Sequence, residues 1–137
     1  MTQPGFHDLI SDTQLRKAID VLGYETPTPV QLAAIPAASA GKNLIVSSKT
    51  GSGKTAAFLL PAIQAMLARP SSNPSSTRML ILTPTRELAR QIVKNAEQIL
   101  KFTSFKVGMV CGGEELKYQK AMLRKNPEIK KTGKTYP

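Results

Sequence analysis

Residues 47–55 combine glycine, lysine and hydroxyl side chains at a spacing suited to binding phosphate, reading Ser-Ser-Lys-Thr-Gly-Ser-Gly-Lys-Thr. Gly51 and Gly53 let the backbone curl so that successive N–H groups point inward, and the helix expected next adds positive partial charge at its start. Lys54 is placed to reach the outer phosphates of a nucleotide, and the Thr55 hydroxyl is a ligand for Mg²⁺. The competing interpretation is a glycine-rich turn without a ligand. It explains less, because a strand pattern precedes the segment and a helical pattern follows it.

One position departs from the strict spacing of such loops. The pattern asks for glycine at position 48, where this chain has Ser48, a residue small enough to fit. Only Lys54 and Thr55 bear on phosphoryl-transfer chemistry, so the sequence supplies no complete catalytic set. The residues predicted to contact the nucleotide phosphates are Ser48, Thr50, Gly51, Ser52, Gly53, Lys54 and Thr55.

Polar and aromatic residues upstream offer a place for a purine base. Gln31 carries an amide with donor and acceptor groups, which suits the edge of adenine, and Tyr24 has a face on which a base can stack. Phe6 stands 17 positions before Gly23. Taken alone, this stretch is better explained as a proline-rich helix start with an exposed glutamine.

Three short apolar runs predict strands buried on both faces, at Asn43–Ser47, Met79–Thr83 and Lys106–Cys111. Helical patterns lie before and between them. They cover Asp12–Leu22 with Ser11 or Asp12 as its cap, Pro29–Ala40 capped by Thr28, Gly53–Arg69, and Thr85–Lys101. Alternation of this kind builds an α/β fold, in which helices pack on both faces of a parallel sheet.

The composition is that of a single folded domain. The chain has 137 residues, 41% of them apolar, and no apolar stretch is long enough to span a membrane. Cys111 is the one cysteine, which excludes an internal disulfide framework and a zinc site built on several thiols. The N-terminus lacks the basic and apolar runs of a signal peptide, so we expect a cytoplasmic protein.

The formal net charge of +10 is concentrated near the C-terminus. Residues 117–137 hold seven of the lysines and arginines and a single acid, Glu128. A basic balance attracts the phosphate backbone of nucleic acids, but solvated tails without that role have the same composition. Charge alone therefore leaves a nucleic-acid partner undecided.

Taken together, the upstream residues and the phosphate loop resemble the DEAD-box RNA helicases. In that family an isolated aromatic, a Gly-aromatic pair and a Thr-Pro-x-x-Gln form an adenine-specific Q motif, and Phe6, Tyr24, Thr28, Pro29 and Gln31 stand at matching positions. Ser48 replaces the alanine that usually begins the family's phosphate loop. The resemblance implies that ATP binds with Mg²⁺. It also implies that Phe6, Tyr24, Thr26 and Gln31 hold the adenine.

Two further stretches resemble the family's RNA-binding motifs. Pro84, Thr85 and Arg86 look like the start of motif Ia, and a strand ending before a helix exposes N–H groups and a hydroxyl that suit a backbone phosphate. Gly112 and Gly113 resemble the GG element, where the absence of side chains lets a nucleic-acid backbone approach. Alone, the first is a well-capped helix and the second a turn. The implied partner is RNA, as a single strand or a duplex end.

The resemblance implies a RecA-like phosphate-loop fold of three αβα layers with a parallel sheet, truncated here to about three strands. We expect residues 1–129 to form part of a helicase ATP-binding domain of bacterial type. Residues 130–137 are expected to be a divergent basic tail. An out-of-frame or truncated end is the favoured origin of that tail, and the alternative is that Lys130, Lys131 and Lys134 grip RNA.

The chain departs from the family pattern in its acids, since no aspartate follows Asp20. The metal-binding Asp and water-positioning Glu of the family are not matched, so we expect no useful ATP hydrolysis by this polypeptide alone. Glu114 and Glu115 are better explained as acids at a helix start than as substitutes. The alternative function is a nucleotide- or RNA-binding module without catalysis. A small kinase is disfavoured by Gln31 and its neighbours.

Overall fold

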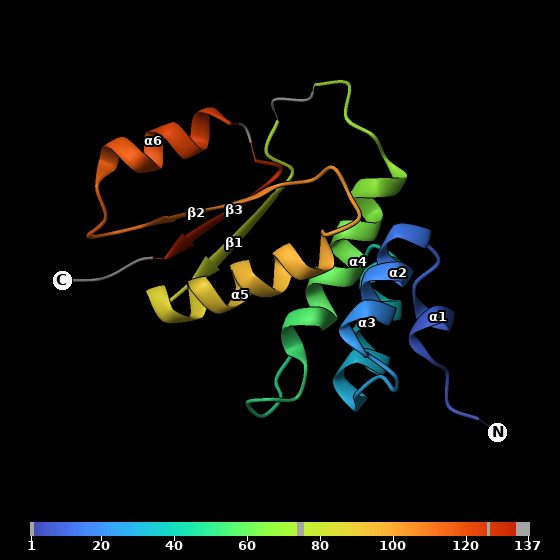
Figure 1. The fold of residues 1–137 in the computed structure, drawn as a ribbon. Coiled ribbons are helices and arrows are strands. Elements are labelled where there is room, and N and C mark those ends of the chain that lie inside the picture. Colours follow the sequence, from blue (N-terminus) through green and yellow to red (C-terminus); the bar gives the residue numbers. More distant parts are fainter. Residues whose placement is uncertain (1, 74–75, 126, 134–137) are drawn as a thin grey trace. The chain divides into compact units, whose positions relative to one another are not determined.

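The computed structural model describes residues 2–73, 76–125 and 127–133. Its elements are α1 (Phe6–Leu9), α2 (Thr13–Leu22), α3 (Pro29–Ser39), α4 (Lys54–Ala68), β1 (Met79–Thr83), α5 (Arg86–Ile99), β2 (Val107–Cys111), α6 (Leu116–Arg124) and β3 (Ile129–Gly133) (Figure 1). They fall into two compact units. Unit 1 comprises the described parts of Met1–Pro70 with Lys101–Thr103, and unit 2 those of Ser71–Leu100 with Ser104–Pro137.

Unit 1 is helical, and its helices begin where their capping residues stand. The Asp12 carboxylate accepts a hydrogen bond from the Leu15 N–H at 3.0 Å, which starts α2, and Thr28 caps α3. Of the two residues predicted as alternative caps of α2, Asp12 and not Ser11 is the cap, and the predicted cap of α3 is confirmed. Apolar side chains of α2, α3 and α4 fill the core, among them Leu15, Ile19, Ile35, Leu59, Leu60 and Ile63.

A glutamine of α4 connects that helix to the segment that leads into α2. The Gln64 carboxamide oxygen accepts hydrogen bonds from the backbone N–H groups of Ser11, at 2.8 Å, and Asp12, at 3.0 Å. These N–H groups lie before the first turn of α2, where no carbonyl of the helix itself can accept them. One side chain therefore fixes the entry of the chain into α2 against α4.

Unit 2 is a three-stranded parallel sheet with strand order β1-β3-β2. Met79 of β1 and Val107 of β2 both stand opposite Ile129, whose side chain is fully buried. Helix α5 contacts all three strands and α6 contacts β2, and Figure 1 shows these helices on opposite sides of the sheet. Ile81, Ala89, Ile92, Ala96 and Ile99 are among the other core residues of this unit.

The strand predicted over Asn43–Ser47 does not form, and that prediction is wrong. Leu44, Ile45 and Val46 are 42%, 103% and 43% exposed, so the apolar run is not buried. The physical reason is pairing: a strand exists only in a ladder, and no strand within the described residues pairs with this segment. The apolar pattern alone was therefore insufficient.

The third strand comes instead from β3, at Ile129–Gly133. The backbone of residues 130–133, which the sequence analysis assigns to the start of a basic tail, pairs with both β1 and β2. The remaining predicted tail, residues 134–137 with Lys134, lies outside the described residues. The other two predicted strands are present, one of them over the same five residues, Met79–Thr83.

Candidate functional site

The turn that precedes α4 has the backbone geometry of an anion site. Gly51 and Gly53 adopt positive φ angles of 79° and 86°, a region that favours glycine. In the part of the chain that the structure describes, the N–H groups of Gly51, Gly53 and Lys54 have no hydrogen-bond partner. Unpaired N–H groups at a helix N-terminus attract a negatively charged ligand such as phosphate.

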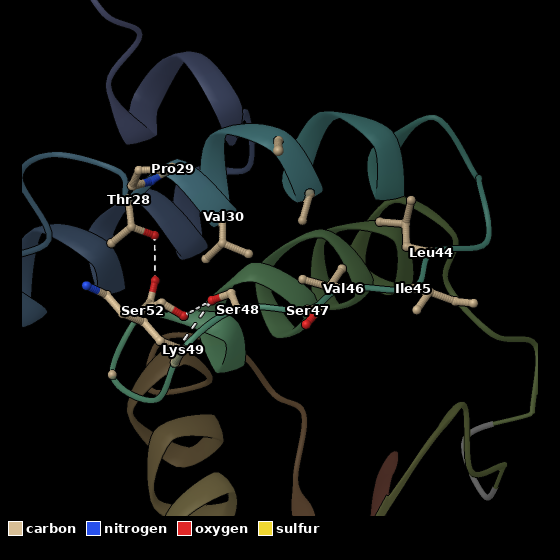
Figure 2. A pocket seen from close by; sticks show the side chains of 13 residues that line it. Thr28, Pro29, Val30, Leu44, Ile45, Val46, Ser47, Ser48, Lys49 and Ser52 are labelled. Atoms are coloured by element: carbon tan, nitrogen blue, oxygen red, sulfur yellow. Dashed lines mark hydrogen bonds between the residues drawn. The ribbon is translucent and has the colours of Figure 1, made fainter.

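Side chains fold over the same turn. The Lys54 ammonium donates hydrogen bonds to the carbonyl oxygens of Ser48 and of Lys49, the latter at 3.2 Å. The hydroxyls of Ser48 and Ser52 are hydrogen-bonded to each other (Figure 2). Lys54 therefore lies against the loop, and among the described residues two of the three N–H donors of its ammonium are used.

Thr55, predicted to hold Mg²⁺, occupies the second position of α4 and is half-buried. Among the described residues its hydroxyl has no hydrogen-bond partner, so the oxygen is free to coordinate a cation. A hydroxyl oxygen is a hard donor of the kind that Mg²⁺ prefers. The described residues contain no cluster of three or more His, Cys, Asp or Glu side chains that would hold a metal by itself.

The start of α3 is hydrogen-bonded to the phosphate loop. The Thr28 hydroxyl donates to the Ser52 carbonyl oxygen at 2.7 Å (Figure 2), and Gln31 Nε2 donates to the Gly53 carbonyl oxygen at 3.2 Å. Gln31 Oε1 in turn accepts from the Thr28 backbone N–H at 2.9 Å. The structure thus joins the predicted adenine-binding glutamine to the loop predicted to hold the phosphates.

Gln31 retains capacity for a ligand although it is 5% exposed. An amide group offers two N–H hydrogens and two carbonyl lone pairs. Gly53 takes one of the hydrogens and Thr28 one of the lone pairs. One donor and one acceptor remain, which is the pair that the edge of adenine requires.

The predicted aromatic residues lie together. The rings of Phe6 and Tyr24 have centroids 5.6 Å apart and are tilted by 33°. Phe6 is 3% exposed, so within this structure its ring packs against Tyr24 and presents no open face, whereas Tyr24 is half-buried and Thr26 exposed. Their roles toward adenine stay predictions.

A hollow of about 820 Å³ lies along the other flank of the loop (Figure 2). Its wall combines Val30 of α3 with Leu44, Ile45 and Val46, and only Ser48, Gly51 and Ser52 of the predicted phosphate contacts reach it. Lys54, Thr55 and Gln31 are not part of its lining. An apolar wall does not suit a triphosphate, so the turn itself, and not this hollow, stays the candidate anion site.

In unit 2, the predicted RNA-binding residues follow the carboxyl ends of β1 and β2. Pro84 and Thr85 are exposed, and the Thr85 hydroxyl caps α5 by accepting from the Leu88 N–H at 3.2 Å. The Arg86 guanidinium packs against Gly113: a Cβ placed on that glycine would lie 3.1 Å from Arg86 Nη1. The structure therefore brings the two predicted RNA-binding stretches together.

Two acids, Glu114 and Glu115, follow Gly113 and lie close to α5 and α6. Glu114 forms an ion pair with Arg90 of α5 at 3.5 Å, and Glu115 is the residue before α6. Both acids thus precede α6, which has no acidic residue in its first turn, and the Glu115 side chain makes no capping hydrogen bond, so their predicted place in the first turn is wrong.

Gln119 of α6 is a residue that the sequence analysis missed. It is 9% exposed, and its amide pairs with both backbone groups of Cys111. A glutamine between lysines on a short helix gives no sign in the sequence that it is buried. Its burial becomes evident only from its hydrogen bonds to Cys111 in the folded structure.

Comparisons with known proteins decide the family. The family model described as "DEAD/DEAH box helicase" matches residues 28–132 of this chain. The chain belongs to this family. The match begins after Phe6, Tyr24 and Thr26 and extends through the first three residues of the predicted basic tail.

Relatives within the helicase family come from plants, fungi and bacteria. DEAD-box ATP-dependent RNA helicase 28 of Arabidopsis thaliana is 46% identical over 124 residues, which are 90% of this chain and 16% of that protein. ATP-dependent RNA helicase SrmB of Haemophilus influenzae is 47% identical over 100 residues, 73% of this chain and 23% of its own length. The chain thus spans about a fifth of these helicases, and its bacterial type stays a prediction.

Solved helicase structures share the fold. The RNA helicase Prp28 from Chaetomium thermophilum bound to ADP has a TM-score of 0.79 and 39% identity, covering 89% of this chain and 30% of that one. A hypothetical ATP-dependent RNA helicase from Sulfolobus tokodaii has a TM-score of 0.78 and 34% identity, covering 89% and 34%. The predicted RecA-like α/β fold, truncated to about three strands, is confirmed.

Proposed function

We propose that this chain binds ATP with Mg²⁺ at the turn before α4 and the phosphate backbone of RNA at the carboxyl ends of β1 and β2, as part of an RNA helicase. Membership of the helicase family supports the substrate class. Within the described residues, no helix is long and apolar enough to cross a membrane. A cytoplasmic location is part of the same proposal.

The observation that carries the nucleotide half of the proposal is the pair of hydrogen bonds from Gln31 and Thr28 to the loop carbonyls. Through these bonds an amide with one donor and one acceptor unused among the described residues lies beside the N–H groups of Gly51, Gly53 and Lys54, which have no partner there either. Lys54 supplies a positive charge for the outer phosphates. Mg²⁺, when bound at the Thr55 hydroxyl, neutralises phosphate charge.

Nucleotide titrations in the presence of Mg²⁺ test this assignment. We expect the 137-residue chain to bind ATP more tightly than GTP, and Gln31→Ala to reduce that preference about tenfold, because one donor and one acceptor to the base are lost. Gln98→Ala, a change at an exposed glutamine of α5, is the matched control. Equal competition by GTP and ATP for the unaltered chain contradicts the adenine site.

The RNA half rests on the Arg86 guanidinium beside Gly113 and on the capped start of α5. Arginine and helix N-termini hold backbone phosphates without reading sequence. We expect Arg86→Ala to weaken RNA binding uniformly across RNA sequences and to lower the salt dependence by about one ion. A loss confined to particular RNA sequences contradicts backbone binding.

Binding without turnover is the second candidate function of this polypeptide taken by itself. Its favouring observation is the acid content, since no aspartate follows Asp20 and Glu114 is engaged by Arg90. Phosphoryl transfer depends on positioned charges. A phosphate-release assay with RNA present is expected to stay at background. Release well above background in the purified 137-residue chain contradicts this candidate.

A further inference from the structure

Gln119 makes three hydrogen bonds, all to backbone groups at the end of β2 and in the turn between β2 and α6. Its Oε1 accepts from the Cys111 N–H at 3.1 Å, and its Nε2 donates to the carbonyl oxygens of Cys111 at 2.9 Å and Glu114 at 3.1 Å. β2 is an edge strand of the described sheet, so the Gln119 amide takes the place of a neighbouring strand at Cys111. The ends of the turn are thereby fixed to one side chain.

This turn contains Gly113, which has a φ of 81°. The Arg86 guanidinium packs against Gly113. Arg90 is tied to the same turn through Glu114. Arg86 therefore lies against the backbone of a turn whose two ends are hydrogen-bonded to Gln119, and Arg90 pairs with a side chain of the same turn. The amide itself is buried and faces away from solvent, so it acts through these groups and does not touch a ligand.

We propose that Gln119 is a positioning residue for RNA: it holds the Gly112–Gly113 turn in the conformation that seats the Arg86 guanidinium for a backbone phosphate. The proposal rests on the RNA site proposed above. Arginine recognises phosphate through the fixed directions of its guanidinium N–H groups. If the turn changes conformation, the positive charge of Arg86 remains, but its N–H groups no longer point toward the phosphate. Removing Gln119 is therefore expected to reproduce the loss of Arg86 with both arginines still present.

A double-mutant cycle separates positioning from general structure. RNA affinity is measured by fluorescence anisotropy with a labelled oligouridine for the unaltered chain, Arg86→Ala, Gln119→Ala and the double variant. We expect each single change to weaken binding about tenfold, and the double variant to be scarcely weaker than either single one, because both remove the same contact. Gln98→Ala, on the exposed side of α5, is the control and leaves the affinity unchanged.

The outcomes distinguish the two proposals. A double variant about a hundredfold weaker than the unaltered chain, the product of two independent losses, overturns the role of Gln119 and leaves the RNA site standing. So does a Gln119→Ala chain that is folded and binds RNA normally. An Arg86→Ala chain that binds RNA normally overturns the RNA site itself, and with it the inference.

Gln119→Glu covers the case in which Gln119→Ala does not fold. A protonated carboxyl can donate to the Cys111 carbonyl and accept from its N–H, whereas the ionised form faces the carbonyl oxygens of Cys111 and Glu114. The charged groups that act on Cys111, the hydrogen-bond partner of this side chain, are the Glu114 carboxylate and the guanidiniums of Arg86 and Arg90. We expect its RNA affinity to recover relative to the unaltered chain as the pH falls from about 8 to about 5. A pH profile parallel to that of the unaltered chain overturns the proposal.

Discussion

The side-chain amide of Gln31 and the backbone of Gly53 are in direct contact: Nε2 donates to the Gly53 carbonyl oxygen at 3.2 Å, and a Cβ on Gly53 would overlap that nitrogen. Gly53 also has a φ of 86°. Two independent constraints, the backbone angle and the close approach, therefore require glycine here. The contact with Gln31 of α3 thus limits the choice of residue before α4 in addition to the backbone angle.

Gly53→Ala is expected to weaken nucleotide binding at least tenfold more than a matched glycine-to-alanine change elsewhere in the chain. The matched control is Gly41→Ala, since Gly41 has a φ of 81° but nothing within 4 Å of an added Cβ. Both variants incur the strain of a left-handed alanine, about 1–2 kcal/mol, while only Gly53→Ala displaces Gln31. Titration with a fluorescent adenine nucleotide measures the difference. Equal losses in the two variants would show that the Gln31 contact has no role.

Ser48→Ala is expected to raise ATP affinity about threefold, because the lost hydrogen bond to the Ser52 hydroxyl holds the ligand-free loop together and is worth about 0.5–1.5 kcal/mol. Calorimetric titration checks this. The control is Ser47→Ala, which removes a neighbouring exposed hydroxyl that has no hydrogen-bond partner among the described residues. Weaker binding by Ser48→Ala would instead mean that this hydroxyl contacts the phosphates.

Gln64→Ala is expected to lower the free energy of unfolding by about 1–3 kcal/mol, because the backbone N–H groups of Ser11 and Asp12 lose their acceptor. Urea unfolding followed by circular dichroism measures the change. Gln98→Ala, the same substitution at an exposed helical position, is expected to stay within about 0.5 kcal/mol. If the two variants unfold alike, the link between α4 and α2 contributes nothing to stability.

The buried thiol of Cys111 is expected to lower the free energy of unfolding as the pH becomes alkaline. Burial raises the pKa of its thiol, as do the hydrogen bond to Glu114 and the charge of that carboxylate, while Arg86 and Arg90 act in the opposite direction. The folded state therefore holds the proton more tightly than the unfolded state, whose thiol has a pKa of about 8.5. The contribution is fully present below that pH and is lost as the pH rises through the folded pKa.

Cys111→Ala tests this dependence. The urea midpoint of the unaltered chain is expected to fall more steeply than that of the variant between about pH 8 and pH 10. Because lysines and tyrosines titrate in both proteins, only the difference between the two slopes reports on the thiol. Parallel slopes would assign the dependence to those other groups.

Local signals in the sequence were sufficient for most elements and for the loop. Asp12 and Thr28 cap the helices they were predicted to cap, and β1 occupies Met79–Thr83 as predicted. These features depend on residues near one another in the chain. The phosphate loop was recognisable for the same reason, since its glycines, lysine and threonine are consecutive.

Long-range pairing explains what the sequence did not reveal. The Leu-Ile-Val run at 44–46 has the pattern of a strand and lacks a partner, while β3 reads Ile-Lys-Lys-Thr-Gly and has two partners. The presence or absence of a pairing partner cannot be predicted from the local sequence pattern. Gln119 was missed on the same ground, because its importance comes from contacts with Cys111 and Glu114.

The strand order determines when the sheet can form during synthesis of the chain. Within the described residues, β1 and β2 do not pair with each other, and each pairs only with β3, which follows both of them in the chain. The 22 residues from Gly112 to Gly133 take about 1–4 s to translate at roughly 5–20 residues per second. During that interval β1 and β2 lack the strand with which they pair in the described fold, and their backbone N–H and C=O groups stay open to chaperones or to another nascent chain.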